Sequence, residues 1–359
     1  MHNKRVLVAM SGGVDSSVTA YLLKSQGYEC VGATMRLTRP APDPATGMSK
    51  VDRDIADAKA VAERLGIPHH VLDLQQTFDR NVIERFVTAY QEGLTPNPCI
   101  ICNRHIKFGA LLDATLDMGC DYIATGHYAT VRERDGKIWL GTARDPVKDQ
   151  TDFLAQIDSL QVAKLMFPVG DLMKEEVRRI AETQRLPSAK RRDSQGICFL
   201  GQIDYNDFVR RFLGEREGAV VEIETGRRIG THKGYWFHTI GQRKGLGLGG
   251  GPWFVVKKDV EQNILYVSHG YDTLLQYGHS FNLKDFHFIT GNPWGDAPEV
   301  DVTFKTRHQP HFMKGRLYRA GHGYRLESPE RIQGIAPGQF GVVYDAAAEI
   351  CIGSGEIGV

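Results

Sequence analysis

The chain has 359 residues, of which 42% are hydrophobic and 24% charged, and this is the composition of an ordinary soluble protein. No apolar run reaches membrane length, and six cysteines are too few for a disulfide scaffold, so we expect a cytoplasmic protein with no membrane partner. The net charge is only +1, so overall electrostatics do not indicate nucleic acid, and any such contact must come from local clusters. The length predicts two or three domains.

The N-terminal stretch predicts an anion site. Residues 5–9 form a short apolar run typical of a buried parallel strand, and apolar residues at helical spacing follow from Val14. A strand, a glycine-bearing turn and a helix N-terminus together bind anions through free backbone N–H groups. Gly12 and Gly13 allow a phosphate to approach the backbone, and Asp15 can hold Mg²⁺. Hydroxyl donors stand at Ser11, Ser16 and Ser17.

The sequence of this turn excludes two common kinds of phosphate-binding loop and resembles a third. The Rossmann spacing of glycines is absent, and so is the lysine of the Walker motif. The string S-G-G-V-D-S-S at 11–17 resembles the PP-loop of ATP pyrophosphatases, which are adenine nucleotide α hydrolase-like enzymes that split ATP between the α and β phosphates. A tight strand–helix turn without a ligand is the alternative.

The following segments alternate between strand and helix, which predicts a doubly wound α/β domain. Met35, near the end of its predicted strand, is placed to contact a bound adenine or else belongs to the core. Residues 129–143 predict a β-hairpin that turns near Asp135 and Gly136. Strands are predicted at 30–37, 69–74 and 121–125, and helices at 51–65, at 77–91, and from about Asn103 to Met118.

The character of the chain changes at about residue 200, where one helix at 205–213 leads into glycine-rich β segments. We predict a PP-loop ATP-binding catalytic domain over 1–200, a central β-rich domain over 201–275, and a C-terminal β-barrel over 276–359. Basic pairs recur after residue 185, and Trp236 and His308 are candidates for stacking on unpaired bases. These basic clusters are 190–192, 227–228, 243–244, 257–258 and Arg307.

Cys99 and Cys102 form a C-x-x-C motif at or just before a predicted helix N-terminus, and Cys198 is a third thiol. A lone C-x-x-C fits a redox pair, half a zinc site, or iron–sulfur ligands, and a zinc site that includes His105 is possible. Three thiolates without a clear fourth ligand indicate a [4Fe–4S] cluster with one open iron. A nucleophile with a resolving cysteine that passes a persulfide is the alternative. We predict that Cys30, Cys120 and Cys351 are buried core residues.

Over nearly its whole length the chain resembles the bacterial tRNA-specific 2-thiouridylase family. The strings that carry the resemblance are S-G-G-V-D-S-S at 11–17, T-P-N-P-x-x-x-C-N at 95–103, A-T-G-H-Y-A at 124–129, D-S-Q-G-I-C-F at 193–199, H-T-I-G-Q-R-K-G-L-G at 238–247 and P-G-Q at 337–339. The resemblance implies that ATP adenylates the C2 oxygen of the wobble uridine of tRNA, and that sulfur then replaces this oxygen.

The resemblance also implies roles for residues. The residues that would bind ATP are Ala9, Met10, Ser11, Gly12, Gly13, Val14, Asp15, Ser16, Met35 and Gly126. Those that would contact the target base are Asn97, Pro98 and Cys99, and those that would contact tRNA elsewhere are His127, Lys148, Asp149, Gln150, Arg307, His308 and Gln339. Cys102 would be the nucleophile and Cys198 the persulfide carrier. The central domain over 201–275 would contact tRNA, and a cysteine desulfurase or sulfur-relay protein would donate the sulfur. We expect a monomer, because tRNA needs broad access to the surface.

The chain departs from the family pattern at Cys99, where many members have aspartate. Aspartate is a poor ligand for a soft iron–sulfur centre and cysteine is a good one, so the departure favours a cluster held by Cys99, Cys102 and Cys198. The two-cysteine persulfide relay stays open. Two other functions also stay open, namely another ATP-dependent ligase with this loop and a non-enzymatic RNA-binding scaffold.

Overall fold

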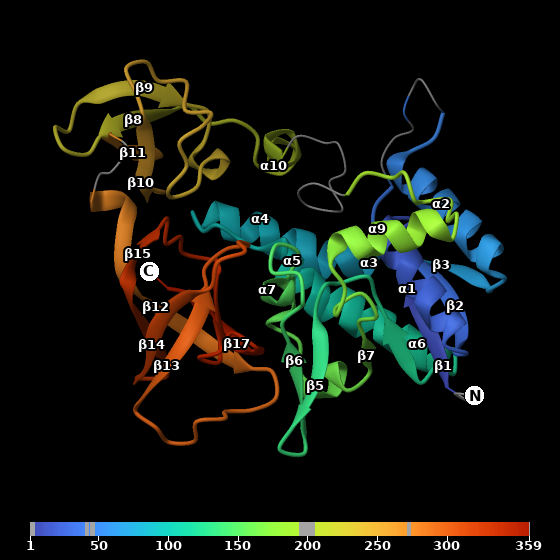
Figure 1. Cartoon of the computed structure of the whole chain (residues 1–359). Helices are drawn as coiled ribbons and strands as arrows, with labels where there is room; N and C mark the ends of the chain where they lie inside the picture. Colours follow the sequence, from blue (N-terminus) through green and yellow to red (C-terminus); the bar gives the residue numbers. More distant parts are fainter. Residues whose placement is uncertain (1–3, 40–42, 44–46, 194–204, 271–273, 359) are drawn as a thin grey trace.

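The computed structural model describes residues 4–39, 43, 47–193, 205–270 and 274–358. Figure 1 shows three regions in chain order: an N-terminal unit of helices around a sheet, a small β region, and a C-terminal barrel. Within the described ranges, no helix combines the length and the apolar character that crossing a membrane requires.

The N-terminal sheet is parallel throughout, with strand order β3-β2-β1-β4-β7. In β1, Val6 and Val8 pack with apolar residues of α1 and α2, whereas Leu7 packs with Phe108 and Leu111 on the opposite face. This period-two alternation shows that helices cover both faces, as the predicted doubly wound fold requires. The strands are β1 (Arg5–Ala9), β2 (Glu29–Arg36), β3 (His69–Asp73), β4 (Tyr122–Ala124) and β7 (Leu165–Met166).

Strand β1 is the point where the strand order reverses, because the chain moves from β1 to β2 on one side and later returns to β4 on the other. In open α/β sheets, ligands bind outside the carboxyl ends of the strands at such a point. Helix α9 packs alongside α1 close to this point (Figure 1). The helices of this side are α1 (Val14–Ser25), α2 (Lys50–Leu65) and α9 (Lys174–Thr183).

The helical stretch after β3 confirms the helix predicted over 77–91, and it has one apolar face on which Phe78, Val82, Phe86 and Tyr90 are all buried. These residues recur every fourth position, and a π-helical segment at the centre of the stretch keeps them on one side. The elements here and on the opposite face of the sheet are α3 (Gln75–Phe78), η1 (Asp79–Ile83), α4 (Glu84–Gln91), α5 (Pro98–Cys102), η2 (Asn103–Ala110), α6 (Leu111–Asp117), α7 (Thr151–Leu154) and α8 (Ser159–Val162).

One helix begins earlier than predicted. Helix α5 begins at Pro98, not near Asn103, and the Asn97 side chain accepts hydrogen bonds from the backbone N–H groups of Cys99 and Ile100. Proline is favoured in a first helical turn because its missing N–H has no partner there in any case. Cys99 and Cys102 therefore lie inside a helix rather than before it, with Cys99 in its first turn.

The predicted hairpin consists of β5 (Thr130–Arg134) and β6 (Lys137–Gly141). Asp135 and Gly136 both have positive φ, at 53° and 68°, as a two-residue hairpin turn with matching twist requires. Strand β6 also pairs with β17, where Leu140 faces Cys351. The hairpin thus extends the sheet of the C-terminal barrel, which local sequence did not indicate.

The middle region has a mixed sheet with strand order β10-β11-β8-β9, which confirms the predicted β-rich segment. Its aromatic core, including Trp236 and Trp253, packs against Phe86 and Tyr90 of α4. The Tyr235 hydroxyl donates to the Gln91 carbonyl at 2.6 Å. The elements are α10 (Tyr205–Leu213), β8 (Gly218–Glu222), β9 (Arg228–His232), η3 (Tyr235–Phe237), β10 (Trp253–Asp259) and β11 (Ile264–His269).

The C-terminal region is the predicted β-barrel. Its antiparallel strands follow the order β12-β15-β14-β13-β16-β17, and pairing of β17 with β12 closes the barrel around Phe281, Phe304 and Leu326. The elements are η4 (Leu274–Gln276), β12 (Tyr277–Phe288), β13 (Glu299–Lys305), β14 (Met313–Ala320), β15 (Gly323–Gln333), β16 (Phe340–Tyr344) and β17 (Ile350–Ile357).

Candidate active site

The loop between β1 and α1 has the geometry of an anion site. Gly12 has φ of 73°, and a Cβ at this position would lie 2.6 Å from the Asp54 carbonyl oxygen and 2.7 Å from Arg191. Glycine is therefore needed for both its conformation and its space. The Ser16 and Ser17 hydroxyls donate to the Gly13 carbonyl at 3.1 and 2.7 Å, and these bonds hold the first turn of α1.

A cavity of 740 Å³ opens beside this loop at the carboxyl ends of β1, β2 and β4. It includes nearly all the residues predicted to bind ATP, namely Ala9, Met10, Ser11, Gly13, Val14, Asp15, Ser16, Met35 and Gly126. Three residues predicted to contact tRNA also line it: His127, Lys148 and Gln150. Its volume suits a ligand of nucleotide size.

Gly126 follows β4 and packs directly against the start of α1. A Cβ here would lie 2.7 Å from the Ser16 backbone nitrogen and 2.8 Å from the Asp15 carbonyl carbon. Real Cβ atoms do not approach backbone atoms this closely, so only glycine lets the end of β4 lie against the loop. This contact fixes one wall of the cavity.

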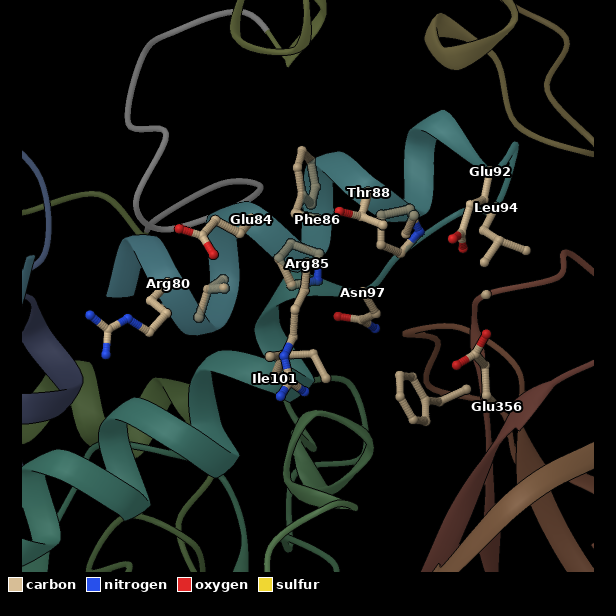
Figure 2. Close-up of a pocket in the computed structure, with 16 residues that line it drawn as sticks. Arg80, Glu84, Arg85, Phe86, Thr88, Glu92, Leu94, Asn97, Ile101 and Glu356 are labelled. Carbon is tan, nitrogen blue, oxygen red and sulfur yellow. The ribbon is translucent and has the colours of Figure 1, made fainter. Parts of the chain in front are cut away.

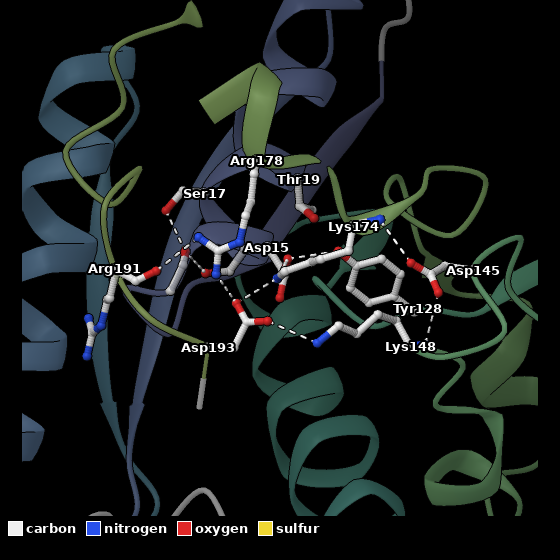
Figure 3. A network of polar contacts seen from close by, with 12 residues as sticks. Asp15, Ser17, Thr19, Tyr128, Asp145, Lys148, Lys174, Arg178, Arg191 and Asp193 are labelled. Carbon is white, nitrogen blue, oxygen red and sulfur yellow. Dashed lines mark hydrogen bonds and ion pairs between the residues drawn. The ribbon is translucent and has the colours of Figure 1, made fainter. Parts of the chain in front are cut away.

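Charged side chains surround the loop (Figure 3). Asp15 accepts hydrogen bonds from Lys174 Nζ at 2.6 Å and from the Tyr128 hydroxyl at 3.0 Å. Burial and the adjacent Asp15 charge raise the pKa of Tyr128 above its usual range, so its hydroxyl stays protonated and can donate. Arg191 donates to the Gly12 carbonyl at 3.0 Å and pairs with Asp57 at 2.6 Å.

Several residues around the loop were not predicted from the sequence, namely Tyr128, Lys174 and Asp193. Tyr128 lies within the string A-T-G-H-Y-A and Asp193 opens D-S-Q-G-I-C-F, so the motifs contain both residues without indicating their role. Lys174 carried no signal, because it begins an ordinary helix far from the loop in sequence.

His127 lies in the wall of the same cavity. One ring nitrogen is 2.8 Å from the Thr125 hydroxyl, and the other is 3.2 Å from Lys107 Nζ. Burial first, and the Lys107 charge second, lower the pKa of His127 well below its usual range. The ring is therefore neutral at physiological pH and contributes hydrogen bonds rather than charge.

Cys102 is 2% exposed and packs in an apolar cluster with Phe78, Val82 and Ile106, whereas Cys99 is half-buried. Met35 and Leu37, which line the nucleotide-sized cavity, pack against this same cluster. The cysteine-bearing helix α5 is thus in contact with the cavity wall through one layer of side chains.

Cys198 lies outside the described residues, so the structure does not bear on the expected trio of thiols. Among the residues that are described, no three His, Cys, Asp or Glu side chains are grouped to hold a metal, and Cys99, Cys102 and His105 therefore form no such site. The two described thiols stand one helical turn apart and have the donor chemistry of an iron–sulfur site. Burial raises the pKa of Cys30 to about 11 and raises that of Cys351 well above its usual range, which confirms both as core thiols.

A second cavity, of 550 Å³, lies between α4, α5 and the barrel. Figure 2 shows Arg85, Asn97 and Glu356 around it. The Gln339 side chain donates to the Thr95 carbonyl at 3.0 Å, and this bond ties the barrel to the segment that leads into α5. Pro98, predicted to contact the target base, is mostly buried but lines this cavity together with Asn97.

Arg307 and His308 are exposed at the end of β13 and can reach a large ligand. The His308 ring stacks on Phe153 with 4.8 Å between ring centroids, and its Nδ1 lies 3.0 Å from the Asp152 carboxylate. Trp236, by contrast, is buried in the core of the middle region, so the predicted stacking of this residue on a base is wrong. Lys258 is also wrong as a phosphate contact, because it donates to the Gly93 carbonyl and burial lowers its pKa to about 8.

The structure contradicts the expected contact of Asp149 with tRNA. Asp149 is 1% exposed, and its carboxylate pairs at 3.1 Å with Lys305, which is also 1% exposed. The carboxylate also accepts hydrogen bonds from the Ala143 backbone and the Thr151 hydroxyl. Asp149 thus joins the N-terminal unit to the barrel and cannot reach a ligand.

We expect Asp149→Ala to destabilise the protein by about 3–5 kcal/mol, because it leaves the Lys305 ammonium buried without its carboxylate. Denaturant unfolding measures this change. The matched control is Arg316→Met in the same barrel, which removes an exposed pair with Asp301 and should cost about 0–1 kcal/mol. Unchanged stability together with weakened tRNA binding would contradict the structural role.

Comparison with known proteins identifies the family. Residues 4–202 match the model described as tRNA methyl transferase HUP domain, residues 206–269 its PRC-barrel domain, and residues 278–357 an aminomethyltransferase beta-barrel domain. The chain is 58% identical over 355 residues to tRNA-specific 2-thiouridylase MnmA 1 of Bacteroides thetaiotaomicron, covering 98% of this chain and 99% of that one. The chain belongs to the tRNA-specific 2-thiouridylase family.

Two further family members give the same result. MnmA 2 of Bacteroides fragilis is 59% identical over 98% of this chain and 99% of its own length. MnmA of Parabacteroides distasonis is 52% identical, with 98% coverage of both chains. For a thiouridylase, the fold is as expected: a parallel-sheet HUP unit, a PRC-barrel-like middle and a closed C-terminal barrel.

Proposed function

We propose that this chain catalyses ATP-dependent 2-thiolation of the wobble uridine of tRNA. The observation that supports this most is the contact between the nucleotide-sized cavity at the PP-loop and the apolar cluster that holds Cys102. Activation of a carbonyl by ATP and attack by sulfur need neighbouring sites, and this arrangement supplies them. The names of the near full-length relatives supply the substrate class.

The first step joins the uridine C2 oxygen to the α-phosphorus of ATP, and the bond from this phosphorus to the β,γ-diphosphate breaks to release pyrophosphate. The backbone N–H groups at the start of α1 and its dipole stabilise phosphate charge. Lys174 and the Tyr128 hydroxyl hold Asp15 at the edge of the loop. Mg²⁺ would neutralise phosphate oxygens here, and Asp15 is the carboxylate available to hold it.

In the second step sulfur forms a bond to C2, the C2–oxygen bond breaks, and AMP leaves with that oxygen. In the proposed relay, the outer sulfur of a Cys198 persulfide attacks C2. The Cys102 thiolate, as the nucleophile, then breaks the S–S bond by attacking the Cys198 sulfur, and an external thiol reduces the Cys102–Cys198 disulfide that results. Alternatively, Cys99, Cys102 and Cys198 would hold a [4Fe–4S] cluster, which would supply an open iron to bind an external sulfur. The soft donor chemistry of Cys99, in place of the aspartate common in relatives, favours the cluster.

The rest of the chain would hold the RNA. We assign ATP chemistry to residues 1–200 and tRNA contacts mainly to 201–275 and 276–359, with Arg307 and His308 exposed on the barrel. Cytoplasmic location, a monomeric state, and a cysteine desulfurase or sulfur-relay protein as donor stay predictions. The other ligase and the RNA-binding scaffold are less well supported, because the near full-length relatives are thiouridylases.

The test is a thiolation assay on unmodified tRNA with ATP, in which 2-thiouridine, AMP and pyrophosphate are quantified. Sulfide is the donor that a cluster would use, and a cysteine desulfurase with cysteine is the donor that a persulfide relay would use. We expect all three products in equal amounts, and none with a tRNA whose wobble uridine is replaced by cytidine. AMP formation that responds to a small amine instead of tRNA would indicate a ligase. Tight tRNA binding without any ATP turnover would indicate a scaffold.

A further inference from the structure

Asp193 lies among three cations beside the PP-loop (Figure 3). One carboxylate oxygen pairs with Lys174 Nζ at 3.0 Å and with Arg178, and the other pairs with Lys148 Nζ at 3.0 Å. Both oxygens are therefore occupied by charged donors that converge from a loop and from α9. This is the arrangement with which proteins bind phosphate.

The cations are positioned by groups other than Asp193. The buried Asp145 carboxylate accepts hydrogen bonds from the backbone N–H groups of both Lys148 and Lys174, at 3.2 and 3.0 Å. Lys174 also reaches Asp15 in the first turn of α1. Lys148, Lys174 and Asp193 line the wall of the nucleotide-sized cavity, next to the positive end of a helix dipole. Arg178 does not line the cavity itself but reaches Asp193 from α9.

The charges of this group favour an added anion once Asp193 moves away. Lys148, Lys174 and Arg178 contribute three positive charges, and Asp15, Asp145 and Asp193 contribute three negative ones, so the group as it stands is neutral. If Asp193 moves away, one positive charge is left uncompensated beside the loop. A diphosphate would neutralise it and would offer the three cations more oxygens than one carboxylate does.

We propose that Lys148, Lys174 and Arg178 form the subsite for the β,γ-diphosphate of ATP, and that Asp193 occupies this subsite as an internal competitor until nucleotide displaces it. The identity of the nucleotide rests on the proposed function. Lys148 then acts on ATP rather than on tRNA. Burial tends to raise the pKa of Asp193, but hydrogen bonds from Lys148 and Lys174 outweigh it and lower the pKa to about 2, so the competitor is charged at physiological pH.

Calorimetric titration of the full chain with ATP, inorganic pyrophosphate and AMP tests this proposal. We expect Asp193→Asn to bind ATP and pyrophosphate about tenfold more tightly, because the competing charge is gone. Arg178→Met should bind both at least about tenfold more weakly. AMP lacks the diphosphate, so its affinity should not change in either variant. Glu182→Gln, which removes an exposed carboxylate from the same helix α9, is the matched control and should bind all three ligands as the wild type does.

Unchanged or weaker binding of ATP and pyrophosphate by Asp193→Asn would overturn the inference, since Asp193 would then support the cations rather than compete for them. Equal loss of AMP affinity in Arg178→Met would also overturn it, by showing general damage to the cavity. A wild-type chain that binds no ATP would instead refute the proposed function. In that case pyrophosphate still tests the inference. Tighter pyrophosphate binding by Asp193→Asn would support it, and unchanged or weaker binding would overturn it.

Discussion

A Gly126→Ala variant will bind ATP at least about 100-fold more weakly than the wild type, because the added methyl group cannot fit between β4 and α1. The new Cβ would lie 2.7 Å from the Ser16 nitrogen and 3.0 Å from the Asp15 Cβ. Both belong to the start of a helix and cannot rotate away as a flexible side chain would. The PP-loop must therefore shift, and a shift of this size misaligns the N–H groups that bind phosphate. Calorimetric titration with ATP measures the loss.

The matched control is Gly249→Ala in the middle region. An added Cβ there meets no atom within 4 Å, and its φ is outside the left-handed region. It should leave ATP affinity unchanged. Thermal unfolding separates a local shift from global damage, since overpacking at Gly126 should cost only about 1–3 kcal/mol of stability. Normal ATP affinity in Gly126→Ala would show that the loop tolerates displacement and that the close contact has no role in binding.

Replacing Cys99 by alanine will reduce thiolation at least about 100-fold, as much as replacing Cys102 or Cys198 does, if the three thiols hold one cluster. ATP affinity should be unchanged, because the cysteine-bearing helix contacts the nucleotide cavity only through intervening apolar side chains. Product analysis of modified tRNA measures the activity. Absorption near about 400 nm after anaerobic reconstitution, which thiolate-ligated clusters give, should be lost in each variant.

Two further variants serve as a control and as a test of the cluster against the relay. Cys30→Ala removes a buried thiol, which is protonated because burial raises its pKa to about 11, and it should keep both activity and absorption. Cys99→Asp replaces a soft thiolate by a hard carboxylate, which is a poor iron–sulfur ligand. Substantial activity in Cys99→Asp or Cys99→Ala, without the absorption, would reject the cluster and leave the relay through Cys102 and Cys198.

Much of the fold could be predicted because its signals are local. The Val6–Leu7–Val8 run predicted a buried strand, and Asp135 with Gly136 predicted the hairpin turn that the positive φ angles confirm. One helix start was predicted too late, at about Asn103, whereas α5 begins at Pro98. Proline breaks a helix interior but favours the first helical position, so it can mark either outcome.

The candidate site divides in the same way. The PP-loop, Met35 and Gly126 were predicted from motifs, and nearly all of these residues line one cavity. The predicted contact of Asp149 with tRNA was wrong, because Asp149 is buried against Lys305, which lies 156 residues away. The burial of Trp236 and Lys258 could not be predicted from residue types either, since each packs against elements distant in sequence.

By itself, the sequence determined the elements, the phosphate loop and the family, because strands, turns and glycine-bearing loops depend on residues within a few positions of one another. Only the tertiary structure decided which charges meet. Lys174 reaches Asp15 across 159 residues, and Asp193 meets Lys148 across 45. The β5–β6 hairpin joins β17 of the barrel across a still longer separation. Such contacts depend on the packing of whole layers against one another, and no local spacing of residues encodes them.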